Sequence, residues 1–381
     1  MVKKRILVLT DHMPWGHRSI ARAIYGYLKT QEKENNFIVD YTEVKAEIGP
    51  GNEIYAFLCR YMPSVHRLAY KLGTSRGANE VLSDLSMRSI NNLKWAVNKY
   101  KPDLIISTYF LHSQALARWK TETEQKYKLW TVVADPRSIT LYSFMKGADL
   151  HLVYDQVGVE IGIEKCGVPK DKILATGWWV RPEMYHSFDR IKSRRKLGFN
   201  DDRPVVFVGG GSLGTSSLAA LLPALMVVKK PVGVVFNSGT DKLTFNMIEE
   251  FSKMYRRLKK GDIVQIRNLG WVENMAEVLT ACDMVFGKAG PNFLFDCVAR
   301  EKPFVAITHV GGQEDGNIGL ILKKKLGWVR ERNNQSVSFF LDYVANPKKY
   351  EEKYIKDIKK EAASNKRTMG IILERLKKEL K

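Results

Sequence analysis

The chain has 381 residues, which is enough for two or three domains of ordinary size. Hydrophobic residues make up 45% and charged residues 27%, which excludes a disordered, collagen-like or coiled-coil protein as a whole. The 61 Lys and Arg residues outnumber the 41 Asp and Glu residues, for a formal net charge of +20. A surface this basic attracts polyanions, which include nucleic acid, anionic lipid headgroups and phosphorylated substrates.

The four cysteines form no CxxC pair, and no histidine lies at ligand spacing from two of them. This pattern favours reduced, buried thiols in a cytoplasmic protein, with no metal site and no disulfide framework. The apolar run after Arg5 is too short to be the hydrophobic region of a secretory signal. The uncharged run 204–228 has the length of a membrane span, but its glycine-rich middle and Pro223 favour a strand, a turn and a helix.

Short runs rich in Val, Ile and Leu recur along the chain and are separated by helical patterns. They form one series at residues 6–10, 104–107, 130–134, 150–154 and 173–176, and a second at 205–208, 232–236, 263–266, 284–286 and 304–307. Continuous apolar runs are typical of strands that helices cover on both faces. The sequence therefore predicts an α/β protein with two doubly wound domains. We expect an N-terminal domain at 1–185, a C-terminal domain at 200–345 and a helical tail at 346–381.

The first strand runs into a loop, residues 11–18, that contains His17. Apolar residues at helical spacing follow, so His17 is predicted where a strand-end loop becomes the start of a helix. Ligands bind beyond the carboxyl ends of strands in open α/β sheets, and a histidine there can accept a proton from a hydroxyl. A loop histidine bonded to the backbone is the alternative.

The second domain begins with a strand that leads into a glycine loop fitting the pattern GxGxxG. The backbone N–H groups of such a loop can approach a diphosphate at a helix N-terminus. The next strand ends in Asn237, where a dinucleotide site would carry an acidic residue, so the nicotinamide interpretation is disfavoured. A tight turn without ligand remains the alternative. The candidate loop residues are Gly209, Gly210, Gly211, Ser212 and Gly214.

Two further strand ends carry polar residues suited to a hydroxyl-rich ligand. One strand leads into residues 288–292, and a helix starting there would place Asp296 about one turn in, where a carboxylate can bind vicinal ribose hydroxyls. The next strand leads into residues 308–317, for which a solvated turn is the alternative. The candidate residues for binding this ligand are Lys288, Ala289, Gly290, Asp296, Gln313, Glu314 and Asn317.

Residues 53–72 carry apolar side chains at helical spacing, interrupted by Pro63. Arg60, Arg67 and Lys71 fall on other faces. A basic amphipathic segment with aromatic residues suits a membrane interface, and a helix packed on the core is the alternative. The net charge of +20 favours the membrane. The candidate membrane or acceptor residues are Tyr55, Phe57, Leu58, Arg60, Tyr61 and Arg67.

These motifs resemble those of the monogalactosyldiacylglycerol synthases and processive diacylglycerol glucosyltransferases. The N-acetylglucosaminyltransferase that makes lipid II is more distantly similar. Residues 15–18, Trp-Gly-His-Arg, resemble the Gly-Gly-His-Arg segment of this family, and residues 288–290 and 312–317 match family motifs closely. Residues 144–182 resemble the passage before the second domain. The resemblance covers residues 6 to about 329.

The resemblance implies an inverting glycosyltransferase of the GT-B fold, in which two Rossmann-like domains face a cleft. The C-terminal domain would bind a UDP-sugar, with the glycine loop on the diphosphate and Asp296 on the ribose. Gln313, Glu314 and Asn317 would contact the sugar and phosphate. His17 and Asp135 match the reactive-loop histidine and an acidic residue after a strand, and either would be the base or orient it.

The expected enzyme is therefore a hexosyltransferase that uses a UDP-sugar substrate and no further cofactor. Its acceptor would be a diacylglycerol-like lipid. We expect a cytoplasmic protein, peripherally associated with the inner face of the cell membrane. Asp296 replaces the usual Glu of the family, and the residues after Asp135 lack its usual His and Trp. A UDP-sugar 2-epimerase is the alternative enzyme, and a nucleic-acid binder is suggested only by the charge.

Overall fold

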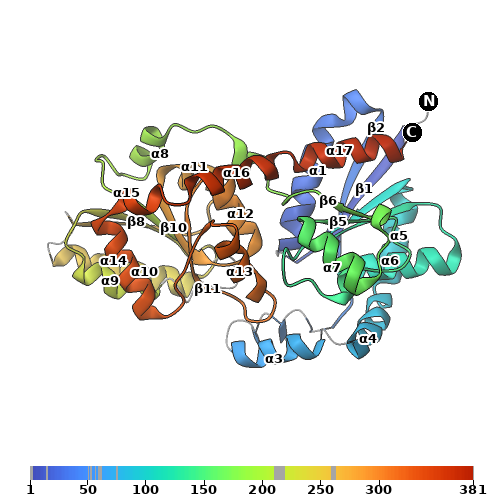
Figure 1. Ribbon diagram of the computed structural model, residues 1–381, viewed down its shortest axis with the longest axis horizontal. Coiled ribbons are helices and arrows are strands. Elements are labelled where there is room, and N and C mark those ends of the chain that lie inside the picture. Colours follow the sequence, from blue (N-terminus) through green and yellow to red (C-terminus); the bar gives the residue numbers. More distant parts are fainter. Residues whose placement is uncertain are drawn as a thin grey trace. The chain divides into compact units, whose positions relative to one another are not determined.

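The computed structural model describes residues 3–13, 16–49, 51, 54–55, 57–58, 62–73, 76–209, 219–258 and 263–380. The chain divides into two compact units (Figure 1). The first unit comprises residues 1–182, 311–313 and 364–381, and the second comprises residues 183–310 and 314–363. Each unit carries one parallel β-sheet flanked by helices.

The first unit holds a six-stranded sheet, among the described residues, in the order β2-β1-β3-β4-β5-β6. All of its pairings are parallel. The strands are β1 (Lys4–Asp11), β2 (Phe37–Val44), β3 (Leu104–Ser107), β4 (Lys128–Val132), β5 (Leu150–Val153) and β6 (Ile173–Ala175). The helices are α1 (Gly16–Asn35), α3 (Pro63–Gly73), α4 (Arg76–Met87), α5 (Ile90–Tyr100), α6 (Phe110–Thr123), α7 (Gln156–Cys166) and α17 (Thr368–Glu379).

The second unit holds the other six-stranded sheet of the described chain, in the order β12-β11-β10-β7-β8-β9. Its pairings are also parallel. The strands are β7 (Val205–Gly209), β8 (Val232–Asn237), β9 (Val264–Leu269), β10 (Met284–Lys288), β11 (Phe304–Thr308) and β12 (Gly327–Val329). The helices are α8 (Arg190–Lys196), α9 (Leu222–Val227), α10 (Lys242–Arg257), α11 (Met275–Ala281), α12 (Pro291–Ala299), α13 (Asp315–Lys323), α14 (Asn333–Ala345) and α15 (Pro347–Glu351).

Every apolar run that the sequence analysis assigned to a strand lies in or overlaps a strand, so the prediction of two doubly wound α/β sheets is confirmed. Two strands were missed, β2 and β12. Both lie at sheet edges, and most residues of β2 are partly exposed. An edge strand with a partly solvated face does not produce the continuous apolar run of a central strand, and β12 has only three residues.

The run at residues 204–228 forms β7 and α9, as predicted. Gly210, Gly211, Ser212 and Gly214 lie outside the described residues. Among the residues that are described, the structure contains no helix long and apolar enough to cross a membrane.

The C-terminal helices belong to both units. Residues 346–363 lie in the second unit, and residues 364–381 lie in the first. The helix α16 (Ile355–Lys366) contains the point of division. Within the first unit, Asn365 Oδ1 accepts a hydrogen bond from the Trp178 backbone N–H at 2.9 Å, and Lys128 forms an ion pair with Glu379. The Lys128–Glu379 pair attaches α17 to β4, and the Asn365 contact attaches the end of α16 to the segment after β6.

Candidate active site

His17 lies in the first turn of α1, at the carboxyl end of β1, because the buried side of this helix packs on the sheet. That side consists of Ile20, Ala21, Ala23, Ile24 and Leu28, the helical spacing that the sequence showed. The strands β1 and β3 are neighbours, so the loops after them meet at one edge of the sheet. This adjacency brings His17 beside Thr108.

The backbone of Thr108 orients the His17 ring. Nδ1 of His17 lies 2.9 Å from the Thr108 carbonyl oxygen, and the Thr108 hydroxyl lies 3.0 Å from the His17 carbonyl oxygen. A carbonyl oxygen can only accept, so Nδ1 carries the proton and Nε2 carries the lone pair. Among the described residues, Nε2 has no hydrogen-bond partner. The imidazole therefore presents a basic nitrogen that none of the described residues uses.

Burial lowers the pKa of His17, and the Thr108 carbonyl and the negative charge of Asp11 act in the opposite direction. The ring is consequently neutral at pH 7, as a general base requires. The sequence analysis assigned no function to Asp11, the last residue of β1. Its carboxylate is buried, and Oδ1 accepts a hydrogen bond from the Ala46 N–H at 3.1 Å. Oδ2 is also buried and has no partner in the described structure.

Two further residues of this cluster were missed, Tyr109 and His112, at the start of α6. The ring of Tyr109 makes edge contacts with His17 at 5.3 Å and with His112 at 5.0 Å between centroids. His112 is fully buried, and burial lowers its pKa to about 4. Neither ring nitrogen has a partner within the described residues. Only the position just beyond a strand end could have indicated these residues from the sequence.

Asp135 follows β4, which is separated from β1 by β3. It is half-buried, and its charge contributes to the raised pKa of Tyr142, of which burial is the larger cause. His17 forms no hydrogen bond with Asp135, although both residues are described. The carboxylate that acts electrostatically on His17 is Asp11.

In the second unit, Lys288 and Glu314 form a buried ion pair that joins the end of β10 to the start of α13. The second carboxylate oxygen of Glu314 accepts a hydrogen bond from the Val310 N–H at 2.7 Å. Both oxygens of Glu314 are therefore used within the protein. A Cβ on Gly290 would lie 2.9 Å from Lys288 Nζ, so a larger residue here would have to displace the end of the lysine side chain.

Asn317 and Ala289 connect the same two loops. The Asn317 side chain is buried, and its Nδ2 donates to the Ala289 carbonyl oxygen at 2.9 Å. Its Oδ1 has no partner in the described structure. Gly209 ends β7 and pairs with Gly287 on β10. Residues 288–290, 314 and 317 are thus brought together, as the sequence analysis expected of a single site.

Asp296 lies on α12 and is buried. Burial raises the pKa of Tyr185, and the charge of Asp296 adds to this effect.

Trp271, to which the sequence analysis assigned no function, follows β9 at the carboxyl edge of the sheet and is 74% exposed. An aromatic residue this exposed at the ligand-binding edge of an α/β sheet presents a face for a planar ring.

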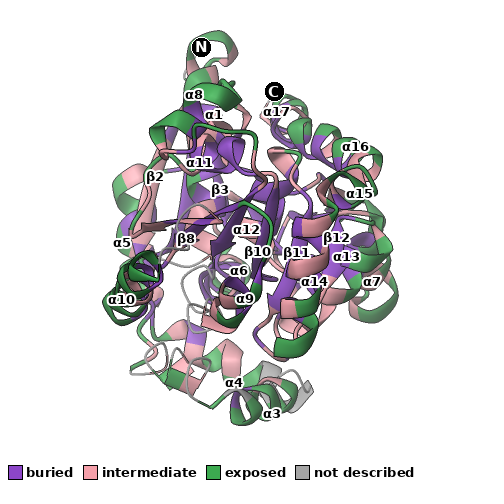
Figure 2. Cartoon of the chain, turned by 90° about the vertical axis from the view of Figure 1, so that its left-hand side faces the viewer, coloured by how far each residue is buried: buried purple, intermediate pink, exposed green. Residues whose placement is uncertain are grey.

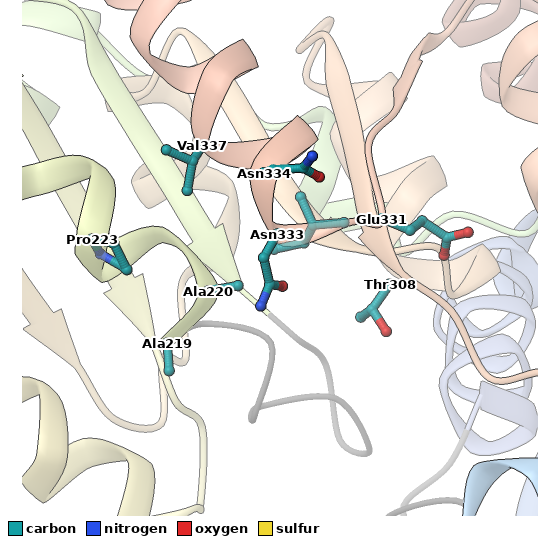
Figure 3. Close-up of a pocket in the computed structure, with 9 residues that line it drawn as sticks. Ala219, Ala220, Pro223, Thr308, Glu331, Asn333, Asn334 and Val337 are labelled. Atoms are coloured by element: carbon teal, nitrogen blue, oxygen red, sulfur yellow. The ribbon is translucent and has the colours of Figure 1, made fainter.

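A pocket of about 630 Å³ opens in the second unit at the end of β11 (Figure 3). Asn333, Asn334 and Val337 of α14 line one side, and Ala219, Ala220 and Pro223 line another. Glu331 at its rim lies 2.5 Å from Nδ1 of His309, whose Nε2 lies 2.9 Å from Asp315. The hydrogen bond to Glu331 is the main reason for the raised pKa of His309.

The segment predicted to meet a membrane forms α3 and the residues before it. Apolar side chains on this segment are exposed, namely those of Ile54, Phe57, Met62, Val65, Leu68 and Leu72. Arg67 and Lys71 are exposed beside them, whereas Tyr55 and Leu58 are half-buried. Figure 2 shows α3 as largely exposed. Arg60 and Tyr61 lie outside the described residues. In a helix packed on a core, these apolar side chains would be buried, whereas here they are exposed to solvent.

Gln313 belongs to the first unit together with Gly311 and Gly312. Its Oε1 accepts a hydrogen bond from the Tyr55 hydroxyl, and the Gly311 carbonyl oxygen lies 3.1 Å from Nδ1 of His66. Gln313 is thus bound within the first unit, whereas its chain neighbour Glu314 belongs to the second.

Known protein families match this chain in two parts, one for each of its two sheets. Residues 17–180 match the family described as Monogalactosyldiacylglycerol (MGDG) synthase, and residues 205–367 match the Glycosyltransferase family 28 C-terminal domain. A probable chloroplastic monogalactosyldiacylglycerol synthase of Nicotiana tabacum is 24% identical over 340 residues, which are 85% of this chain and 61% of that protein. The chain thus spans about three-fifths of the length of the plant synthase. A processive diacylglycerol beta-glucosyltransferase of Bacillus licheniformis is 23% identical and covers 92% of this chain and 89% of that protein.

Solved structures share the architecture at low identity. MurG of Acinetobacter baumannii superposes with a TM-score of 0.60 at 12% identity, over 97% of this chain and 99% of that one. A UDP-GlcNAc 2-epimerase of Neisseria meningitidis, solved with UDP-GlcNAc, gives 0.61 at 12% identity, over 98% and 100%. These likenesses establish the GT-B fold. The family matches go further: residues 17–180 belong to the monogalactosyldiacylglycerol synthase family and residues 205–367 to the glycosyltransferase family 28 C-terminal domains, and most of the chain is similar to monogalactosyldiacylglycerol synthases and a diacylglycerol glucosyltransferase.

Proposed function

We propose that this protein transfers a hexose from a UDP-sugar to the hydroxyl of a diacylglycerol-like lipid at a membrane surface, with inversion. The observation that carries the proposal is the state of His17. Its tautomer is set by the Thr108 carbonyl, and its basic Nε2 has no partner among the described residues. A neutral imidazole held in this way at a strand end is suited to accept a proton from a bound hydroxyl.

The reaction forms one bond and breaks another at the anomeric carbon of the sugar. The acceptor oxygen attacks this carbon while the bond to the β-phosphate oxygen of UDP breaks, and UDP leaves with the bonding electron pair. The hydroxyl proton passes to Nε2 of His17. Asp11 stabilises the imidazolium that results, because its buried negative charge favours the protonated ring.

The donor would bind at the carboxyl edge of the second sheet. Lys288, Glu314 and Asn317 hold the loops after β10 and β11 in one arrangement, which fixes the backbone around the sugar. The exposed ring of Trp271 offers a stacking surface for the uracil. We retain Asp296 as the candidate for the ribose and the glycine loop as the candidate for the diphosphate.

The acceptor would reach the protein from a bilayer through α3. Apolar side chains exposed beside Arg67 and Lys71 are typical of a helix lying in the interface of an anionic membrane. The same contact would keep the protein at the membrane without a spanning segment. As in the sequence analysis, we propose that the protein acts at the inner, cytoplasmic face of the cell membrane.

The test is an activity screen of UDP-glucose, UDP-galactose and UDP-N-acetylglucosamine with diacylglycerol in anionic vesicles. We expect release of UDP with one of the three donors and a glycolipid product of inverted configuration. Incubation of the same donors without lipid is the matched control. Release of UDP or epimerisation of the sugar in that control, with no glycolipid in the complete reaction, would indicate the soluble 2-epimerase instead.

A further inference from the structure

The helix α10 of the second unit has an apolar stripe on its outer side, which the sequence analysis did not identify. Leu243, Met247, Met254 and Leu258 are exposed by 40% to 82% of their surface. Spacings of four and seven residues place these side chains on one side of the helix, over about four turns. Figure 2 shows the outer surface of α10 as exposed.

The stripe is not needed to attach the helix to its sheet. A different side of α10 is buried, through Thr244, Ile248, Ser252 and Tyr255. Asp241 caps the helix, and its Oδ1 accepts from the Thr244 N–H at 3.1 Å. The helix is thus already fixed, and the stripe remains in contact with solvent. Apolar area of this kind, gathered along one helix, usually marks an interaction surface.

Basic side chains lie on other parts of the exposed surface of α10, and by helix geometry Arg257 is the nearest of them to the stripe. Lys242, Lys253, Arg256 and Arg257 are all exposed on α10. Of these four, only Lys253 forms an ion pair within the described part of the chain, at 2.7 Å from Glu250. The positive charge at the C-terminal end of the helix is therefore available to an anionic partner.

We propose that α10 is a second membrane-contact helix, through which the second unit lies on an anionic bilayer. Apolar residues along one side, with Lys and Arg on the exposed polar surface, are the pattern of helices that lie in a lipid interface. A second copy of this chain is a poorer occupant of the stripe. It would bring the same unpaired arginines together in a protein whose net charge is already +20.

This inference rests on the part of the proposed function that brings the protein to a bilayer. It does not require that a sugar be transferred. The protein would be held by two helices, α3 in one unit and α10 in the other, each with its own apolar and basic residues. Loss of one contact would weaken membrane binding without abolishing it.

Vesicle binding by full-length variants tests the inference. The variant Leu243→Gln/Met254→Gln removes the apolar contacts, and Ile191→Gln/Leu322→Gln is its control, because these two residues are also exposed apolar residues of the second unit. We measure partitioning onto phosphatidylcholine vesicles that contain phosphatidylglycerol. The first variant should lower the partition coefficient about 5-fold or more, and the control should bind as the wild type does.

A second pair of variants tests the charge. Arg256→Gln/Arg257→Gln should lower the partition coefficient roughly 10-fold at low salt and less at high salt. The control Lys192→Gln/Arg195→Gln on α8 removes the same net charge and should lower the partition coefficient less. Thermal melts of all four variants check folding, and calorimetry with UDP checks the donor site separately.

Equal binding by the α10 variants and their controls would overturn the proposal, while α3 and the sugar transfer would be unaffected. A wild type that sediments as a dimer, and becomes a monomer only in the Leu243→Gln/Met254→Gln variant, would assign the stripe to self-association. Failure of the wild type to bind UDP would instead contradict the proposed function. In that case, α10-dependent vesicle binding would still support the second membrane contact.

Discussion

At the carboxyl edge of the first sheet, two buried side chains keep polar atoms without partners in the described structure, whereas at the edge of the second sheet Lys288 and Glu314 bind each other and, of Asn317, Oδ1 alone has no partner among the described residues. Asp11 and His112 each bury polar atoms with no hydrogen-bond partner in the described structure, and Nε2 of His17 is unused. In the second unit, Lys288 and Glu314 are buried as an ion pair.

The two arrangements have different energetic consequences. A buried polar atom without a partner costs roughly 1–3 kcal/mol of stability, so a cluster of them is expected where the groups serve chemistry. A satisfied buried pair fixes the shape of a loop and is costly to break. Substitutions in the first cluster should therefore reduce activity more than stability, and substitutions in the second should reduce stability first.

The largest expected effect is on turnover. His17→Ala removes the group that accepts the hydroxyl proton, and kcat should fall about 10²- to 10⁴-fold. His186→Ala is the control, because the His186 side chain is exposed and belongs to the second unit, not to the His17 cluster. Both variants should bind UDP as the wild type does. Comparable turnover in the two variants would remove His17 from the chemistry.

The next effect is on the stability of the second unit. Lys288→Met leaves the Glu314 carboxylate buried without its cation, and unfolding in urea should become easier by about 3 kcal/mol. Lys196→Met breaks an ion pair whose lysine is exposed and should change stability by less than about 1 kcal/mol. The double variant Lys288→Met/Glu314→Gln should regain part of the loss. If the single variant is as stable as Lys196→Met, the pair does not hold the loops.

The third prediction concerns pH. Burial lowers the pKa of His112 to about 4, so between pH 6.5 and about 4 the unfolded chain binds a proton that the folded chain does not. Stability should therefore fall as the pH falls through this window, by up to about 3 kcal/mol from this residue. His151 has the same direction of shift. His112→Phe should be less sensitive to pH than the wild type in urea unfolding between pH 7 and 4.5. An unchanged slope would contradict the buried neutral state.

The smallest expected effect is on the pH dependence of turnover, and it distinguishes Asp11 from Asp135 as the carboxylate that acts on His17. Asp11→Asn keeps the acceptor for the Ala46 N–H but removes the charge that raises the pKa of His17. We expect the acidic limb of the rate profile to move to lower pH, with kcat lowered about 10-fold. Asp135→Asn is the matched comparison and should leave the limb in place. The opposite result would assign the orienting role to Asp135.

The central strands and the first helix could be predicted from the sequence because their side chains are buried on both faces or at helical spacing. For such elements, as in β1 and α1, the local pattern of apolar residues is sufficient to predict the strand or helix. The edge strand β2 could not be predicted in this way, because its partly exposed residues depend on which neighbours the sheet supplies. The motifs at Lys288 and Glu314 were visible because each is contiguous in the chain.

The amino-acid sequence by itself determined two parallel sheets, the strand ends that carry polar residues, and the position of His17 at one of them. Only the tertiary structure decided which groups meet there. The Thr108 carbonyl and Asp11 act on His17, and Glu314 is paired with Lys288, because neighbouring strands bring together residues that are far apart in the chain. The exposure of α3 and α10 was also decided in three dimensions, since an apolar side of a helix looks the same in a sequence whether or not the fold covers it.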